Sequence, residues 1–246
     1  LGNKFMKHTV LSTVQYLMVT LSIFSTTVSA ELEAYRTDLP PALDDSGWDL
    51  MLEKNGIKVF TRDWPGSDFI AFKAEQVVQS KLSNIVANFS DIKTFPEWVK
   101  DMVDAYEIEP FDDERSRKIY MRMGLPWPLA DRDIVAGQQL TQETDSKVVR
   151  IKEWFEGDAL PKNEGVIRTP KVNNELVLIP EGNEKTRIVW QGHTEPGGFI
   201  PAFIVNFLLE DVFYESVLNM RHRFESPEFH KTSDWVINYN DSGTES

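Results

Sequence analysis

Two short stretches decide the fold of this chain: PWPLADRD at residues 126–133 and EPGGFIP at residues 195–201. Each joins rigid turn residues to a regular pattern. The first leads into a β-branched run that predicts a strand over about 132–143. The second opens the longest amphipathic helix pattern, over about 199–224, where Pro201 fits because the first helical turn does not need its N–H. Together they predict a sheet that grips one long helix.

The remaining patterns complete this arrangement. Ser46 is expected to cap a helix with Trp48, Leu50, Met51 and Leu52 on its apolar face, stopped by Asn55-Gly56. Short turns between successive strand patterns favour an antiparallel meander. The other predicted elements are strands at about 57–64 and 69–78, helices from Ser80 and near 91–99, and strands at about 103–111, 116–124, 132–143, 147–156, 174–180 and 186–194. The expected fold class is α+β, a curved antiparallel sheet wrapped around a long C-terminal helix in a helix-grip fold.

The amino-terminal segment has the three parts of a secretory signal peptide. Lys4 and Lys7 precede an apolar run at 10–24, and Val28-Ser29-Ala30 resembles a small-residue cleavage site. A membrane-spanning anchor needs about 20 predominantly apolar residues, more than this run offers. We therefore expect cleavage after Ala30 and a secreted or periplasmic protein, with an uncleaved anchor as the alternative.

The composition limits the function classes. Hydrophobic residues make up 41% of 246 residues, enough for a sizeable core, and so wholesale disorder is excluded. The net charge of −13 argues against a nucleic-acid partner, since phosphate binding requires clustered Lys and Arg. The absence of cysteine excludes disulfides, thiolate metal sites and cysteine nucleophiles.

Several motifs occur in an order and spacing that resemble the START (StAR-related lipid-transfer) domain family. They cover roughly residues 46–230, although Glu195 stands where many members have Asp. On a free-standing domain, a signal peptide is typical of a bacterial, periplasmic member. The motifs are GIKVFTR at 56–62, Trp98, Pro126-Trp127-Pro128, Arg132-Asp133, GVIR at 165–168, EPGGFIP at 195–201 and Asn206.

The resemblance implies a hydrophobic tunnel for one lipid or other apolar small molecule, gated by the last helix. The expected organisation is a signal peptide at 1–30, an arm at 31–45, a START-like lipid-binding domain at 46–230 and a polar tail at 231–246. We expect a non-enzymatic monomer that contacts membranes transiently to bind and transfer its ligand. The alternatives are a helix-grip enzyme (a cyclase, aromatase or hydrolase acting on a hydrophobic molecule) and an interaction protein with a filled core.

The candidate ligand-binding residues fall into two groups. In the strands and turns, Arg132 and Asp133 lie side by side on opposite faces of the sheet. They are either a polar anchor for a ligand headgroup or a structural ion pair. Trp127 either lines the cavity mouth or pins its loop to the core. Trp154 and Trp190 are core residues or ligand contacts, and the candidate set from this group is Trp127, Arg132, Asp133, Arg168 and Trp190.

The second group lies on the long helix, where Phe199, Phe203 and Phe207 belong to one apolar face with Ile200, Ile204 and Leu208. This face is either ordinary core or the underside of a lid. Gly197 and Gly198 supply the backbone freedom of a hinge.

Catalytic and metal signals are weak. His193 beside Glu195 is either an acid/base pair or a structural strand end. No two histidines have i, i+4 spacing, and the chain lacks a nucleophile elbow and a phosphate-binding glycine loop. We therefore expect no metal, no cofactor and no catalytic residue.

Overall fold

The computed structural model describes residues 47–238, with the side chains of 207–211 left out. The predicted signal peptide and arm lie outside the described residues, as does the tail from residue 239. None of the described helices has both the length and the apolar character that crossing a bilayer requires.

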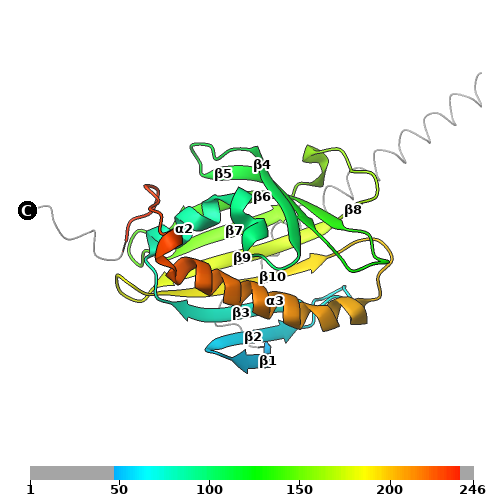
Figure 1. Cartoon of the computed structure of the whole chain (residues 1–246), viewed down its shortest axis with the longest axis horizontal. Helices are drawn as coiled ribbons and strands as arrows, with labels where there is room; N and C mark the ends of the chain where they lie inside the picture. Colours follow the sequence, from blue (N-terminus) through cyan, green and yellow to red (C-terminus); the bar gives the residue numbers. More distant parts are fainter. Residues whose placement is uncertain (1–46, 239–246) are drawn as a thin grey trace, which may run out of the picture. The chain divides into compact units, whose positions relative to one another are not determined.

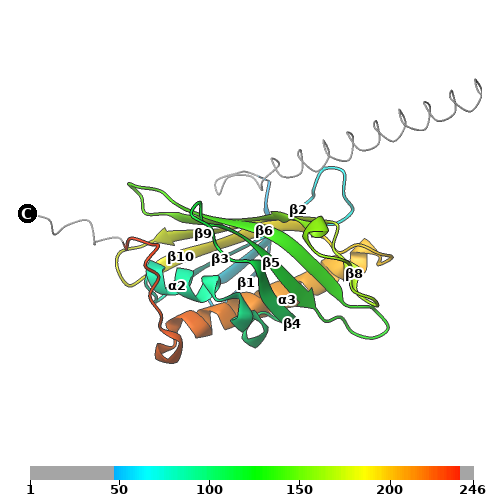
Figure 2. The same cartoon turned by 90° about the horizontal axis from the view of Figure 1, so that it is seen from above.

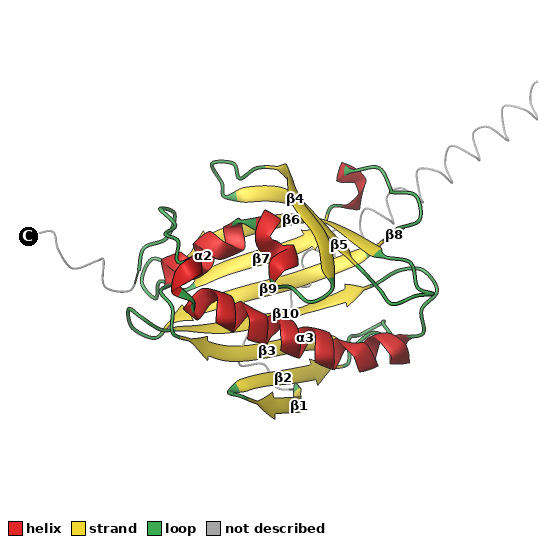
Figure 3. Cartoon of the chain, in the orientation of Figure 1, coloured by secondary structure: helices red, strands yellow, loops and turns green. Residues whose placement is uncertain are grey.

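One curved sheet dominates the fold (Figures 1 and 3). Its order is β1-β2-β3-β10-β9-β7-β6-β5-β4, every pair along this path is antiparallel, and β8 runs parallel to β6. The predicted meander is therefore present from β4 to β10, with the short β8 added. The strands are β1 Asp49–Lys54, β2 Ile57–Arg62, β3 Ala71–Val78, β4 Met102–Glu109, β5 Ser116–Met123, β6 Arg132–Gln142, β7 Val149–Phe155, β8 Ile167–Arg168, β9 Lys171–Pro180 and β10 Thr186–Glu195.

The long helix α3, Ala202–Glu225, lies across the inner face of the sheet (Figures 1 and 2). It packs against β2 and β3 and against α2, Leu82–Ser90. Short 3₁₀ turns occupy Ile92–Glu97, Gly157–Ala159 and Pro227–Phe229. The predicted helix-grip fold is confirmed.

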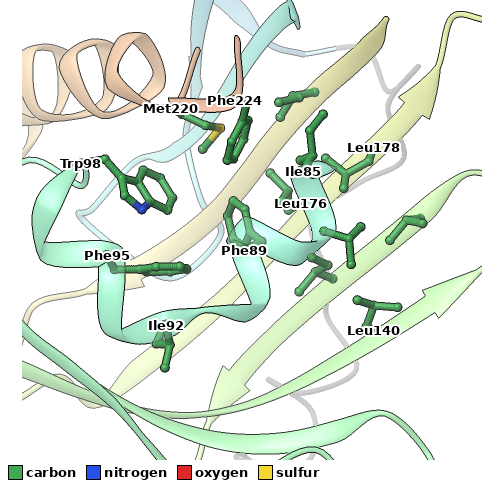
Figure 4. Packing of buried hydrophobic residues seen from close by; sticks show 14 of the residues in the cluster. Ile85, Phe89, Ile92, Phe95, Trp98, Leu140, Leu176, Leu178, Met220 and Phe224 are labelled. Atoms are coloured by element: carbon green, nitrogen blue, oxygen red, sulfur yellow. The ribbon is translucent and has the colours of Figure 1, made fainter. Parts of the chain in front are cut away.

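The core gathers at the end of the sheet where α2 meets the end of α3. Phe89, Phe95 and Trp98 contact one another edge to face, with ring centroids 4.7–5.7 Å apart. Phe224 closes this group from α3 at 6.0 Å from Trp98 (Figure 4). These rings pack closely on one another, and Phe89, Phe95 and Trp98 also border a cavity described below.

The predicted first helix is wrong: the residues after Trp48 form strand β1, paired with β2 from Asp49 to Lys54. Leu50, Met51 and Leu52 have the apolar content of a short helix, but Asn55-Gly56 makes a hairpin turn in which both residues have positive φ. An Asn-Gly pair between two strands is the strongest local hairpin signal, and it outweighs the weak helical pattern. The helix predicted near 91–99 is likewise reduced to the 3₁₀ turn Ile92–Glu97.

The first residues of the predicted polar tail pack against the domain. Val236 is buried, and Trp235 contacts Phe111 edge to face at 4.5 Å. The side chain of Gln142 bonds both backbone groups of Ile237, at 2.8 and 3.0 Å. This short segment therefore closes the outer end of β6.

Candidate functional site

A cavity of about 320 Å³ lies between the inner face of the sheet and α3. Its wall is mostly apolar, with few polar groups, which is the usual character of a site for a hydrophobic small molecule. The described lining residues are Ile70, Phe72, Phe89, Phe95, Trp98, Val99, Asp101, Met102, Met121, Met123, Leu125, Pro126, Arg132, Ile134, Ile151, Glu153, Thr169, Asn174, Leu176, Trp190, Thr194, Pro196, Ile200, Val205, Val212, Phe213 and Ser216.

The first half of α3 covers this cavity, but not all of the predicted apolar face points into it. Val205, Val212 and Phe213 reach the wall, together with Ile200 before the helix. Phe199 and Phe203 instead point outward and are 95% and 73% exposed. The side chain of Phe207 lies outside the described set. Periodicity alone marked an apolar stripe, but this helix is apolar on more than one side, so the stripe did not identify the inward face.

The second half of α3 is fixed by polar contacts on both sides. Gln76 donates to the backbone carbonyl of Val217 at 2.9 Å and accepts from Arg221 at 3.0 Å. Asn55 donates to the hydroxyl of Tyr214 at 2.8 Å. Asn84 of α2 donates to the carbonyl of Phe224 at 3.1 Å. These bonds hold residues 214–225 to the β1–β2 turn, β3 and α2.

A row of polar side chains crosses the inner face of the sheet over four neighbouring strands. Arg117 Nε on β5 donates to Gln138 Oε1 on β6 at 2.7 Å, and Gln138 Nε2 donates to Glu153 on β7 at 2.8 Å. Asn174 Nδ2 on β9 donates to the other carboxylate oxygen of Glu153 at 3.3 Å. Because each amide is oriented by its neighbours, Glu153 acts as the hydrogen-bond acceptor of the row.

Glu153 and Asn174 are the members of this row that face the cavity. Burial raises the pKa of the Glu153 carboxyl, against the donated bonds of Gln138 and Asn174, which lower it. Glu153 therefore presents a carboxyl group to a mostly apolar cavity, where a hydrogen bond is stronger than in water.

Arg132 also lines the cavity. It lies at the start of β6, whereas the polar row crosses β6 at Gln138. Its side chain is buried, and its two terminal nitrogens donate to the carbonyls of Ala130 and Gly197. Within the described chain its Nε is buried without a hydrogen-bond partner. Burial lowers the pKa of Arg132, and the neighbouring Asp131 only partly offsets this.

Asp133 and Arg168 form a buried ion pair on the other face of the sheet. Arg168 donates to both carboxylate oxygens of Asp133, at 2.7 and 3.0 Å, and to the carbonyls of Gly157, Leu160 and Pro161. Neither residue lines the cavity. Arg132 and Asp133 therefore do not form an ion pair with each other. Arg132 faces the cavity, whereas Asp133 holds the 157–168 segment through Arg168.

The turn before α3 requires its glycines. Gly197 and Gly198 have φ of 68° and 67°, in the left-handed region that favours glycine. A Cβ on Gly198 would lie 2.8 Å from the Ile167 side chain, and one on Gly197 would lie 3.0 Å from the Arg168 carbonyl. The turn is therefore packed closely on the segment that Asp133 anchors.

Large aromatic residues stand in solvent on the two loops around Arg132. Trp127, on the loop that leads to Arg132, is 92% exposed, and Phe199 follows directly after Gly198. Such exposure is uncommon for aromatic side chains of this size. The structure thus places Trp127 at the outer rim of the loop and not against the core.

The remaining candidates divide between the two faces of the sheet. Trp190 lines the cavity and contacts Phe213 of α3 at 4.9 Å. Trp154 packs over Gly137 on the other face and donates to Glu156 at 2.7 Å. His193 also lies on that other face, stacked on Trp64 at 4.7 Å, with its Nε2 3.2 Å from the Phe69 carbonyl.

His193 and Glu195 therefore do not meet in the cavity. Glu195 pairs with Lys171 at 3.0 Å, and burial lowers the pKa of His193 to about 4. Among residues 47–238, no three His, Asp or Glu side chains come together in a group able to hold a metal ion. The sequence signal that was missed is the inner polar row, whose members are 15 to 21 residues apart and become neighbours only through strand pairing.

Comparison with known proteins agrees with this architecture. The family model described as START domain matches residues 31–228. The chain is 26% identical over 178 residues to an uncharacterised protein of Pseudomonas aeruginosa, covering 72% of this chain and 87% of that protein. It is 25% identical over 173 residues to the phosphatidylcholine transfer protein of Bos taurus, covering 68% and 79% respectively.

Solved structures show the same fold. The STAR-related lipid transfer protein of Xanthomonas axonopodis superimposes with a TM-score of 0.68 at 24% identity, covering 74% of this chain and 100% of that one. Human StAR-related lipid transfer protein 5 gives 0.66 at 18% identity, covering 87% and 99%. The family model, the fold and the cavity agree, and the chain belongs to the START domain family.

Proposed function

We propose that this protein binds a lipid or another apolar small molecule in the cavity beneath α3 and transfers it between membranes, with no catalytic step. Lipid binding and transfer is the general function of the family to which the chain belongs, and one relative is named for phosphatidylcholine transfer. The observation that carries the proposal is the apolar cavity of about 320 Å³ covered by the first half of α3. Burial of ligand surface there contributes about 25 cal/mol per Å².

Entry and release take place where the covering half of α3 meets the loops that carry Trp127 and Phe199. The exposed aromatics at this end support transient membrane contact, because aromatic side chains are favoured at the bilayer interface. The second half of α3 stays bonded to the sheet, so the gate is the segment from Gly197 to about residue 213. We propose that a monomer carries out this cycle.

The positions of His193 and Glu195, the pair that suggested an enzyme, favour a binding role over an enzymatic one. His193 and Glu195 lie on the face of the sheet opposite the cavity. Glu153 faces the cavity, but the side chains bonded to it are amides, which do not form an acid/base pair.

The compartment is part of the proposal. The basic, apolar and small-residue pattern at 1–30 supports export to the periplasm or beyond, as expected of a bacterial member with a cleaved signal peptide. Fractionation of cells that express the full chain, with mass determination of the mature amino terminus, tests this. We expect a periplasmic or secreted protein that begins at Glu31, and an intact cytoplasmic chain would contradict it.

The test of function is uptake of a lipid by the purified protein. Native mass spectrometry after incubation with phosphatidylcholine vesicles should show a one-to-one complex, and fluorescent lipid should move from donor to acceptor vesicles. A Trp127→Ser, Phe199→Ser double variant should transfer lipid several-fold more slowly, whereas Leu50→Ser, at an exposed position on the edge strand, should not. Empty protein with no transfer would refute the proposal.

A further inference from the structure

The cavity has a basic side chain at one end and a carboxyl group at the other, so its two ends differ as sites for the polar head of a ligand. Arg132 lies at the loop end, and Glu153 faces the cavity beside Gln138, six residues farther along β6. At about 3.3 Å per residue, the two positions are roughly 20 Å apart along the strand. Apolar side chains such as Ile134 and Met121 lie between them.

Arg132 lacks the partner that a buried cation needs. A guanidinium has five N–H donors, and in the described chain Arg132 directs two of its nitrogens to backbone carbonyls. Its Nε has no acceptor, and its side chain is buried from bulk water. A buried charge of this kind is costly unless an opposite charge accompanies it.

The nearby carboxylates are already engaged elsewhere. Asp131 accepts from Arg122 Nε at 2.8 Å, and Asp133 is paired with Arg168 on the opposite face. Asp101 reaches the cavity wall but is exposed and lies 3.7 Å from Lys100. The counter-ion position at Arg132 is therefore left for a ligand.

We infer that Arg132 is an anion subsite that takes the carboxylate or phosphate of a single-chain amphiphile, whose hydrocarbon tail lies along Ile134 and Met121 towards Leu176. This inference rests on the proposed function and specifies its ligand class. The volume of about 320 Å³ is at the lower end of the roughly 300–1,000 Å³ typical of small-molecule sites, which favours one chain over two. The Glu153 carboxyl disfavours the reverse orientation, because it would face the anionic head.

The position of Arg132 also explains how the head is delivered. Nη2 of Arg132 bonds Gly197 in the turn before α3, and Trp127 lies five residues earlier on the adjoining loop. An anionic head that leaves a bilayer between the exposed aromatics meets Arg132 first, and the tail follows into the apolar wall.

The test compares three probes that have the same hydrocarbon chain length but different heads. They are dodecanoate, dodecyl phosphate and dodecan-1-ol, each titrated into the protein at pH 8. Tryptophan emission reports binding because Trp98 and Trp190 line the cavity. The native protein should bind both anions at least tenfold more tightly than the alcohol. Arg132→Gln should weaken both anions about 10- to 100-fold, the range expected for a hydrogen bond to a charged group, and leave the alcohol within about threefold. Arg132→Lys should retain most of the anion preference.

Arg187→Gln is the matched control, since it removes the same charge from an exposed arginine paired with Glu181 in a distant turn. Its anion affinity should equal that of the native protein. Equal affinity of the native protein for alcohol and anions would overturn the inference and leave lipid binding standing, and this comparison holds even where Arg132→Gln does not fold. An equal loss of all three probes in Arg132→Gln would show a structural role. Failure of all three to bind the native protein would overturn the inference and the proposed function together.

Discussion

The two halves of α3 belong to one helix but have different surroundings. Residues 214–225 are bonded to the β1–β2 turn, β3 and α2 through the side chains of Asn55, Gln76 and Asn84. Over residues 202–213, Asn206 is the described side chain that bonds to the rest of the domain, to the Ile70 amide and the Asp68 carbonyl, both at 3.4 Å. The same helix therefore acts as an anchor at one end and as a cover over the cavity at the other.

Because the two halves are held differently, we expect them to open at different free energies. Segments with few buried contacts and few bonds open at low free energy, whereas densely packed segments open only with global unfolding. The close packing of Phe224, Trp98 and Phe89 belongs to the second kind (Figure 4). We therefore expect residues 202–213 to open at a lower free energy than residues 214–225.

The largest expected effect is a difference between the two halves of α3 in how much a substitution lowers the free energy of unfolding. Phe224→Ala removes a fully buried ring from the anchor and should lower the free energy of unfolding by about 3–5 kcal/mol. Val205→Ala, on the cavity wall in the cover, should cost about 1 kcal/mol or less, since its neighbours on one side are cavity and not packed atoms. Urea denaturation of both variants provides the measurement. Similar losses would show that the two halves are packed alike.

The next effect depends on pH and acts through the loop on which the cover rests. His193 contacts the Phe69 carbonyl, next to the Ile70 amide that bonds Asn206. Burial lowers the pKa of His193 to about 4, and the charge of Lys171 adds to this decrease. The nearby Glu195 carboxylate acts in the opposite direction. The folded protein therefore keeps this ring neutral where the unfolded chain, with a histidine pKa of about 6.5, becomes protonated.

Since the unfolded state binds the extra proton, this contribution to stability is complete above pH 6.5 and is lost as the pH falls towards 4. The loss should reach at most about 3 kcal/mol, from 1.36 kcal/mol per pKa unit. His193→Gln should show a correspondingly shallower decline between pH 7 and pH 4.5 in denaturation experiments. Parallel curves for the variant and the native protein would mean that other groups account for the decline.

The smallest expected effect concerns Asn206, the side chain among the described residues of the cover that bonds to the rest of the domain. Asn206→Ala should change the free energy of unfolding by only about 0.5–1 kcal/mol, because both of its bonds are long, one being half-buried and the other exposed. Release of a fluorescent lipid should nevertheless become faster. Asn55→Ala, which removes a bond to Tyr214 in the anchor, is the control and should leave the release rate unchanged.

The sequence was sufficient to predict most of the fold. Turn residues and alternating patterns located the strands from β2 to β10, except the two-residue β8, and the order of elements identified the helix-grip arrangement. The first strand was missed because a six-residue segment is too short for its apolar pattern to distinguish a strand from a helix. Its pairing with β2 makes it a strand.

The site was less predictable, since it depends on which face each side chain occupies. Arg132 and Trp190 line the cavity, whereas Phe199 and Phe203 turn outward. The helix is apolar on several sides, so a pattern of period 3.6 does not reveal its orientation. The row of Arg117, Gln138, Glu153 and Asn174 required the strand register, which is a property of the whole sheet.

The most direct measurement is amide hydrogen exchange along α3 with and without a bound lipid. The account predicts that residues 202–213 exchange much faster than 214–225 in the empty protein, and that a ligand slows exchange in 202–213 alone. Uniform protection along the whole helix, unchanged by ligand, would contradict both the covering role of the first half and the cavity as the binding site.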